Sequence, residues 1–143
     1  MQQYGNFAPE RLNHYPHMFM LDIAIWERFI DKFGSNYMGF DYDIKVGKGT
    51  EPVPGLGEKY QRMQAILSKY RVDCVGYTDS DITIIEVKPE AGTTAIGQIE
   101  LYVSLYKRDF NPDRTVKGMI VTDRELPDMR WYSESKGVNL IIV

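Results

Sequence analysis

The sequence has little cysteine: Cys74 is the single one in 143 residues. One thiol cannot form an internal disulfide, and it cannot supply the cysteine pair of a zinc site. The chain also has no run of about 18 apolar residues, which a membrane helix needs, and its N-terminus lacks the basic start and apolar core of a secretory signal. We therefore expect a protein of a reducing, cytoplasmic compartment with no membrane partner.

Positive charge is not in excess either. The chain has 17 Lys and Arg residues against 20 Asp and Glu residues, which gives a net charge of −3. This excludes a globally basic, nucleic-acid-binding composition, but a local basic strip can lie on a slightly acidic protein. The hydrophobic fraction of 43% is ordinary, and the length predicts a single domain, residues 1–143, with its own core.

Hydrophobic spacing divides the chain into helices and strands. Helical spacing occurs in the segments 22–33, 58–70 and 93–110, with a short turn or helix over 127–136. Strands are predicted for the segments 36–47, 71–78, 82–88, 116–123 and 137–143. Residues 1–17 predict an irregular N-terminal arm, and residues 47–70 predict a loop plus an inserted helix between the first two strands.

The order of these elements predicts an α/β fold with a mixed sheet and helices on its faces. The strands 71–78 and 82–88 are separated by the turn-like "DSD" and predict a hairpin. The last two strands are joined through a helix, which predicts a right-handed crossover and parallel pairing.

Three charged residues lie near the open end of the predicted hairpin. Glu86 and Lys88 are two apart on one strand, so they share a face. On the preceding strand, Asp73 shares a face with Arg71 and Val75, and hairpin pairing would bring it opposite the Glu86–Lys88 end. Two adjacent carboxylates repel and raise each other's pKa unless a cation lies between them.

Such oxygen ligands suit Mg²⁺ or Mn²⁺, with water completing the coordination shell. The backbone carbonyl of Val87, between the two charged residues, is a further candidate ligand. A metal held there would activate water for attack on a phosphoryl group, and Lys88 would orient that water or neutralise charge on the phosphate.

Each of these residues also has an ordinary structural interpretation. Opposite charges two apart on a strand usually mark a solvated face, an amphipathic helix usually exposes a glutamine such as Gln98, and Tyr102 would normally be core. Arg71 either pairs with a carboxylate or contacts phosphate, and Glu27 either binds metal or pairs with Arg28 or Lys32. The same choice between a solvated face and a phosphate-contact strip applies to the basic residues Lys107, Arg108, Arg114 and Lys117.

The combination of Asp73, the "EVK" of residues 86–88 and Gln98-x-x-x-Tyr102 resembles the PD-(D/E)XK nuclease superfamily. The order of elements downstream is similar to the catalytic domain of NucS-type mismatch endonucleases. The resemblance covers about residues 71–143 and, more loosely, the leading helix and strand. It does not extend to the separate N-terminal DNA-binding domain of that family.

The resemblance implies a restriction-endonuclease-like core of order αβββαβ. It implies Asp73 and Glu86 as metal ligands, Lys88 as the catalytic lysine, and Gln98 with Tyr102 lining the site. The superfamily often adds a glutamate from its first helix, for which Glu27 is the candidate, through water.

We therefore expect a Mg²⁺- or Mn²⁺-dependent nuclease that hydrolyses phosphodiester bonds in DNA, of a kind that would suit a phage or mobile element. Arg71, Lys107 and Arg108 are the candidate DNA contacts. One site cuts one strand, so a homodimer or a partner protein is expected if both strands are cleaved. Two alternatives stay open: an inactive member of the fold that acts as a nucleic-acid-binding or assembly subunit, and a protein-interaction module built around residues 47–70.

Overall fold

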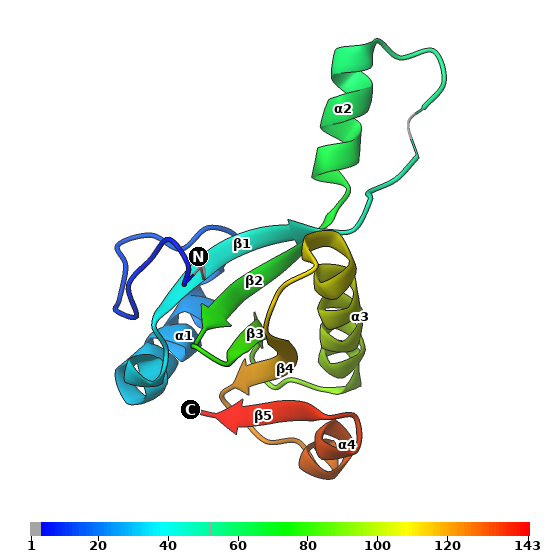
Figure 1. Cartoon of the computed structure of the whole chain (residues 1–143). Coiled ribbons are helices and arrows are strands. Elements are labelled where there is room, and N and C mark those ends of the chain that lie inside the picture. Colours follow the sequence, from blue (N-terminus) through cyan, green and yellow to red (C-terminus); the bar gives the residue numbers. More distant parts are fainter. Residues whose placement is uncertain (1–3, 52) are drawn as a thin grey trace.

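The computed structural model describes residues 4–51 and 53–143. Residues 1–3 of the predicted arm and Pro52 of the predicted insertion lie outside the described residues. The elements, shown in Figure 1, are α1 (Met20–Phe33), β1 (Gly39–Val46), α2 (Glu58–Leu67), β2 (Tyr70–Tyr77), β3 (Asp81–Val87), α3 (Thr93–Phe110), β4 (Thr115–Thr122), α4 (Met129–Ser135) and β5 (Val138–Ile142). They agree with the predicted order, including the inserted helix between the first two strands.

The five strands form one mixed sheet in the order β1-β2-β3-β4-β5. The pairs β1–β2 and β2–β3 are antiparallel, which confirms the predicted hairpin. The pairs β3–β4 and β4–β5 are parallel, which confirms the parallel pairing predicted for the last two strands.

Helices cover both faces of this sheet, so each face has its own apolar cluster (Figure 1). α3 packs Ile96 and Ile99 against one face, and α1 packs Trp26 and Phe29 against the other. The central strand β3 supplies both sides, with Ile84 in the α3 cluster and Ile85 in the α1 cluster. Burial of each such side chain stabilises the fold by about 1.5–3 kcal/mol before the entropy cost of ordering it.

The insertion, residues 47–69, leaves this layered body (Figure 1). None of the ten residues of α2 is buried. Its loop is hydrogen-bonded to its own helix: Thr50 N donates to Ser68 Oγ at 2.7 Å, and Val53 N donates to Gln64 Oε1 at 3.2 Å. The segment therefore folds largely against itself.

The described part of the N-terminal arm is irregular, as predicted, but it is packed. Phe7 forms a β-bridge with Phe40, and Tyr15 is buried. The arm lies so close to β1 that a Cβ on Gly39 would fall 2.1 Å from the Tyr4 carbonyl oxygen, so this position requires glycine.

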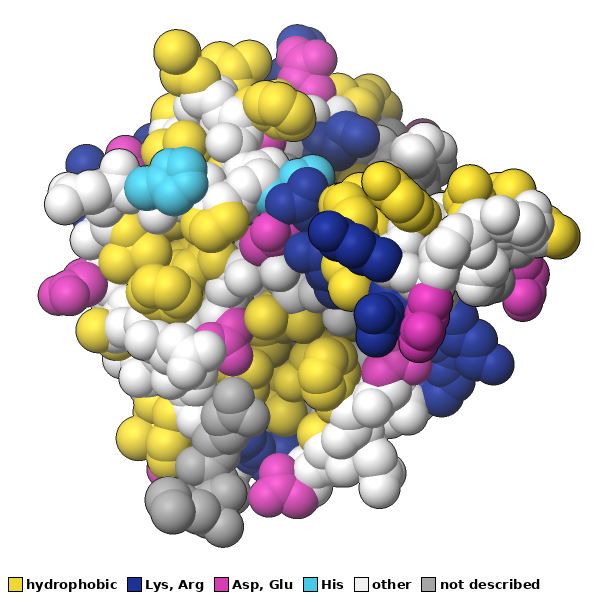
Figure 2. All heavy atoms as spheres, turned by 90° about the horizontal axis from the view of Figure 1, so that it is seen from above, with side chains coloured by type: hydrophobic (Ala, Val, Ile, Leu, Met, Phe, Trp, Pro, Cys, Tyr) yellow, Lys and Arg dark blue, Asp and Glu magenta, His cyan; other side chains and the backbone are white. Residues whose placement is uncertain are grey.

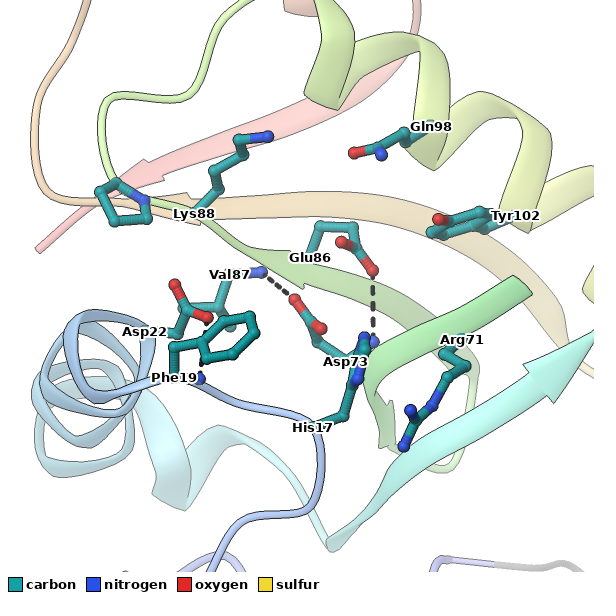
Figure 3. Close-up of a pocket in the computed structure, with 11 residues that line it drawn as sticks. His17, Phe19, Asp22, Arg71, Asp73, Glu86, Val87, Lys88, Gln98 and Tyr102 are labelled. Atoms are coloured by element: carbon teal, nitrogen blue, oxygen red, sulfur yellow. Dashed lines mark hydrogen bonds between the residues drawn. The ribbon is translucent and has the colours of Figure 1, made fainter. Parts of the chain in front are cut away.

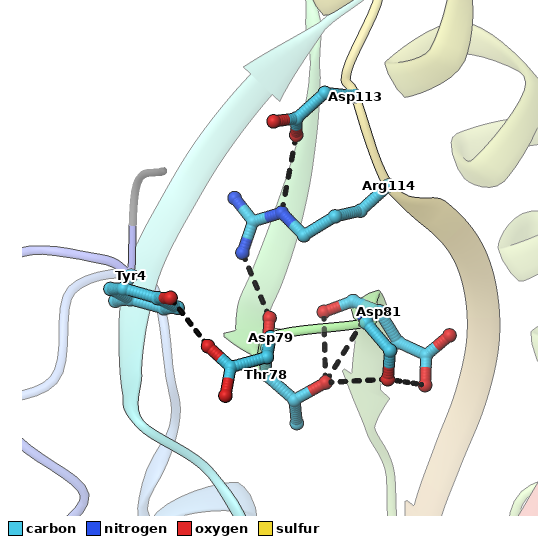
Figure 4. A network of polar contacts seen from close by, with 7 residues as sticks. Tyr4, Thr78, Asp79, Asp81, Asp113 and Arg114 are labelled. Atoms are coloured by element: carbon cyan, nitrogen blue, oxygen red, sulfur yellow. Dashed lines mark hydrogen bonds and ion pairs between the residues drawn. The ribbon is translucent and has the colours of Figure 1, made fainter. Parts of the chain in front are cut away.

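Polar contacts join the arm to the hairpin turn (Figure 4). Tyr4 donates its hydroxyl to Asp79 in the β2–β3 turn, and Arg114 Nη1 donates to the Thr78 carbonyl at 2.9 Å. The Arg114 guanidinium also lies over the rings of Tyr4 and Tyr77. The closed end of the hairpin is therefore fixed from two sides, while its other end opens into a cavity.

No helix among the described residues has the length and apolarity to cross a bilayer.

Candidate active site

A cavity of about 370 Å³ lies at the open end of the β2–β3 hairpin. It brings together all of the side chains that the sequence predicts as catalytic, contributed by β2, the end of β3 and α3: Asp73, Glu86, Lys88, Gln98 and Tyr102. Val87 and Arg71 also line it. Figure 3 shows these side chains converging from the strands and from α3.

The cavity exists because the β2–β3 ladder stops early. The last paired residues are Cys74 and Ile85, and beyond them the strands are joined through side chains. Val87 N donates to Asp73 Oδ2 at 2.9 Å, and Asp73 N donates to Glu86 Oε1 at 3.2 Å (Figure 3). The two carboxylates thus replace backbone carbonyls as acceptors at the point where the strands separate.

The alternation of side chains along β2 is interrupted at the same point. Val72 and Val75 both belong to the α3 cluster, whereas Cys74 belongs to the α1 cluster. The prediction that Arg71, Asp73 and Val75 share one face of a regular strand is therefore wrong, because the alternation of faces changes near Asp73. On β1, Asp43 has φ of 55°, a left-handed conformation that allows a change of face there.

Burial sets the protonation of the carboxylate pair. Only 8% of Asp73 is exposed, and desolvation raises the pKa of both Asp73 and Glu86. The negative charge of Asp73 raises the pKa of Glu86 further, more than the nearby Lys88 ammonium lowers it. Without a cation, both carboxyl groups therefore keep their protons to a higher pH than they would in water.

Lys88 is fixed through its backbone and free at its tip. Lys88 is the residue after Val87, where β3 ends, and its N–H donates to the Val121 carbonyl of β4 at 3.0 Å. Its side chain is exposed, and its ammonium points toward Gln98 (Figure 3). Pro89 follows and has no N–H with which to extend the ladder.

Gln98 and Tyr102 lie one turn apart on α3, so both face the cavity. Tyr102 is 7% exposed, and its ring packs against that of Tyr70 with 5.7 Å between centroids. Burial, together with the negative charge of Glu86, raises the pKa of Tyr102 to about 12, so its hydroxyl keeps its proton. Tyr102 thus has both the predicted core role and a place in the cavity.

The first helix contributes Asp22 to the cavity wall, and Glu27 does not line it. The Glu27 carboxylate lies 3.8 Å from the Arg11 guanidinium instead. Asp22 Oδ2 accepts from Phe19 N at 3.1 Å, which caps α1, and its charge adds to the raised pKa of Asp73. The carboxylate of the first helix that lines the cavity is therefore Asp22 and not Glu27, and a contact of either with a metal stays a prediction.

Sequence reasoning also missed His17 and Phe19, which line the cavity from the end of the arm. His17 has φ of 67°, an uncommon backbone for a residue other than glycine. Nothing in its sequence context distinguishes it from His14, and it reaches the cavity because the arm is packed on the sheet.

The predicted nucleic-acid contacts lie in three places. Arg71 lines the cavity and forms a bidentate pair with Asp43, with both N–O distances at 2.7 Å. Arg108 lines a separate groove beside the insertion. Lys107 lines a cleft next to β4 and β5. Lys107 and Arg108 thus line two different hollows, and neither lines the cavity of Asp73 and Glu86.

Asp73 and Glu86 form a donor set that suits a hard cation with few protein ligands. In the part of the chain that the structure describes, no group of three His, Cys, Asp or Glu side chains is arranged to hold a metal ion. Each carboxylate uses one oxygen for a backbone N–H, which leaves a second oxygen for another partner. Mg²⁺ usually keeps several waters and takes one or two carboxylates plus substrate phosphates, so the residues present fit it.

Comparison with known proteins identifies the fold. No protein-family model and no curated protein matches the sequence. A repair endonuclease from Pyrococcus abyssi is similar in structure, with a TM-score of 0.53 and 17% identity over 92% of this chain and 49% of that chain. An EndoMS–double-stranded DNA complex is similar with a TM-score of 0.50 and 18% identity, over 93% and 49% of the two chains.

The chain has a restriction-endonuclease-like α/β fold. It spans about half the length of each of these two endonucleases. At 17% and 18% identity the likeness extends to the fold, so the chemistry must be argued from the cavity itself.

Proposed function

We propose that the protein is a metal-dependent nuclease of the PD-(D/E)XK type that hydrolyses phosphodiester bonds in DNA. The observation that carries the proposal is the pair Asp73 and Glu86, two largely desolvated carboxylates that meet at the end of a hairpin beside Lys88. Carboxylates with raised pKa values in a cavity are typical of functional sites. Burying two carboxylates side by side costs free energy, and a pair with only a structural role would avoid that cost by being exposed or by pairing with a basic residue.

Asp73 and Glu86 would hold Mg²⁺ or Mn²⁺ in place of the proton that they retain, with the Val87 carbonyl as a candidate additional ligand. When bound, such a metal polarises a phosphoryl oxygen and lowers the pKa of its water. Asp22 lies at the cavity wall, where it would contact the ion through water, the role that the sequence assigned to Glu27.

The remaining residues would act on the phosphate and on the attacking water. The Lys88 ammonium is exposed, and its backbone is fixed on β4, so it can orient water or neutralise charge that develops on the phosphate. The Gln98 amide offers both a donor and an acceptor to water or substrate. The Tyr102 hydroxyl stays protonated and is therefore available as a hydrogen-bond donor.

DNA is the proposed substrate because one structural neighbour is in complex with double-stranded DNA and the other is a repair endonuclease. One cavity of this kind cuts one strand. A homodimer or a partner protein would be needed for cleavage of both strands.

The test is cleavage of single-stranded, duplex and mismatched DNA with Mg²⁺ or Mn²⁺. We expect Glu86→Gln and Lys88→Ala to lower kcat by at least about 100-fold, the usual effect of removing one group that stabilises developing charge. Glu90→Gln is the matched control, because Glu90 is exposed and pairs with Arg124 at 3.0 Å. Full activity of the Glu86 and Lys88 variants would refute the assignment.

A non-cleaving nucleic-acid-binding or assembly subunit is the second candidate. It is favoured by the small donor set, since among the described residues no third carboxylate or imidazole completes a cluster. Calorimetry separates the two proposals: the nuclease binds Mn²⁺ and Glu86→Gln abolishes that binding, whereas the subunit folds normally and binds no divalent ion.

A further inference from the structure

A second groove, of about 330 Å³, lies between the insertion and α3. One side is formed by the first residues of the insertion, Gly47 to Thr50, with Ser68 and Tyr70 at its end. The other side is the outer face of α3, at Leu101, Leu105 and Arg108. We call this hollow the insertion groove.

Hydrogen bonds and close packing fix the residues that form one wall of the groove. Gly47 N donates to Asp109 Oδ2 at 2.7 Å, which ties the start of the insertion to the C-terminal end of α3. The same carboxylate accepts from Arg108 Nε at 2.9 Å and so orients that guanidinium. Gly49 has φ of 77°, and a Cβ there would fall 2.2 Å from the Ala65 carbonyl oxygen, so the loop is closely packed on the end of α2.

Positive charge is concentrated in this part of the molecule. Residues 45–71 carry six basic and two acidic side chains, hence +4, within a chain whose net charge is −3. Among the described residues, the charged side chains that line the groove are both cationic, Lys48 and Arg108. Figure 2 looks onto the end from which the insertion projects and shows Lys and Arg side chains gathered beside exposed hydrophobic ones.

Two tyrosines connect the groove with the candidate active site. Tyr70 lines the groove, Tyr102 lines the cavity, and their ring centroids are 5.7 Å apart. Tyr70 is 50% exposed, so part of its ring is available to a ligand. Exposed aromatic rings flanked by cations are the usual platform for unpaired bases, because every base has a face that can stack while its phosphates meet the cations.

Building on the proposed function, we propose that the insertion groove binds an unpaired nucleic-acid strand that continues from the phosphate in the candidate active site. Tyr70 stacks on a base, Lys48 and Arg108 contact the backbone phosphates, and Leu101 with Leu105 forms an apolar floor. The strand is unpaired because bases in a duplex stack on one another and leave no face for Tyr70.

The experiment measures binding of labelled single-stranded and duplex oligonucleotides by fluorescence anisotropy, with the full chain in EDTA so that no cleavage occurs. DNA and RNA probes of one sequence are compared. We expect Tyr70→Ala to raise the single-strand Kd by about 5-fold or more, and Tyr70→Phe to restore it, since stacking needs the ring and not the hydroxyl. Lys48→Ala should flatten the slope of log Kd against log salt by about 0.7, the value for one phosphate contact.

The matched control is Lys59→Ala, an exposed lysine of α2 that does not line the groove; its Kd should stay within about twofold of wild type. Wild-type single-strand affinity in Tyr70→Ala and Lys48→Ala overturns the groove proposal, and leaves the nuclease proposal standing if DNA is still cleaved. Loss of affinity in these variants of a protein that cleaves no DNA supports the groove and defeats the nuclease. A third outcome would also overturn the groove proposal, in favour of a protein contact. In that outcome the wild type self-associates, Leu67→Ser abolishes the self-association, and strand binding is unchanged in the groove variants.

Discussion

In the layered core, α3 buries one side against the sheet at Ala95, Ile96 and Ile99, whereas no residue of α2 in the insertion is fully buried. The charges differ as well: residues 45–71 carry +4, which leaves −7 for the rest of a chain whose total is −3. Apolar burial thus holds the candidate active site in place, while α2 lies in the segment with a net positive charge and contributes little to the core. The apolar core and the net positive charge thus lie in different parts of the molecule.

The largest expected effect is on the free energy of unfolding, after a substitution in the core. Ile99 is fully buried, and Ile99→Ala should lower the free energy of unfolding by about 2–5 kcal/mol, because it removes buried methylenes and leaves a cavity. Leu67 is 73% exposed, and Leu67→Ala should change it by less than about 0.5 kcal/mol. Urea denaturation measures both. A large cost at Leu67 would show that α2 is covered in solution.

Protonation of the carboxylate pair gives the next effect. The folded-state pKa of Glu86 lies above its unfolded value of about 4.3, so between these values the folded chain binds more protons than the unfolded one. The free energy of unfolding of the metal-free protein should therefore fall as pH rises through that window.

Glu86→Gln removes the contribution of Glu86 to this dependence and keeps an acceptor for Asp73 N–H. We expect it to stabilise the metal-free protein at pH 8 by about 1.4 kcal/mol or more, the value of one pKa unit. Denaturation at pH 6 and pH 8 checks the sign, and a wild-type protein that is more stable at pH 8 in EDTA would contradict it.

Metal addition should reverse that trend. A cation that binds the folded state at ten times its Kd stabilises it by about 1.4 kcal/mol, and the gain should increase from pH 6 to pH 8 because the carboxylates must lose their proton to bind. Thermal melting with and without Mn²⁺ measures it. Glu90→Gln should behave as wild type, and Glu86→Gln should show no gain.

The smallest effect is expected for removal of the insertion. Val46 and Tyr70 pair across β1 and β2, so residues 48–68 can be replaced by a two-residue Asn-Gly turn. The unfolding free energy should change by less than about 1 kcal/mol, because few core contacts are lost and the loop is shortened. Chemical denaturation with circular dichroism is the measurement, and failure to fold would show that the core depends on the insertion.

Much of the fold and of the cavity follows from local rules. The helix predicted over 93–110 and the hairpin of β2 and β3 rest on spacing and on a turn, and both are confirmed. The convergence of Asp73, Glu86 and Lys88 follows from the hairpin, because the start of β2 lies beside the end of β3. Their roles in catalysis stay a prediction.

The parts that sequence reasoning missed depend on long-range packing. Glu27 is five residues after Asp22, which places it about 140° further around α1, and only the seating of α1 on the sheet decides which of them faces the cavity. His17 reaches the cavity through an arm with no periodicity. The change of face at Asp73 accompanies a left-handed Asp43 on another strand, which no local pattern in β2 indicates.

The early end of the β2–β3 ladder has a consequence for which substitutions the hairpin tolerates. Asp73 and Glu86 accept the backbone N–H groups that close the sheet there, so an alanine at either position would leave a donor unpaired near the core and loosen the hairpin. Asparagine and glutamine keep an oxygen in place while they remove the charge. A relative that keeps this scaffold without the charged pair should therefore carry amides at these two positions.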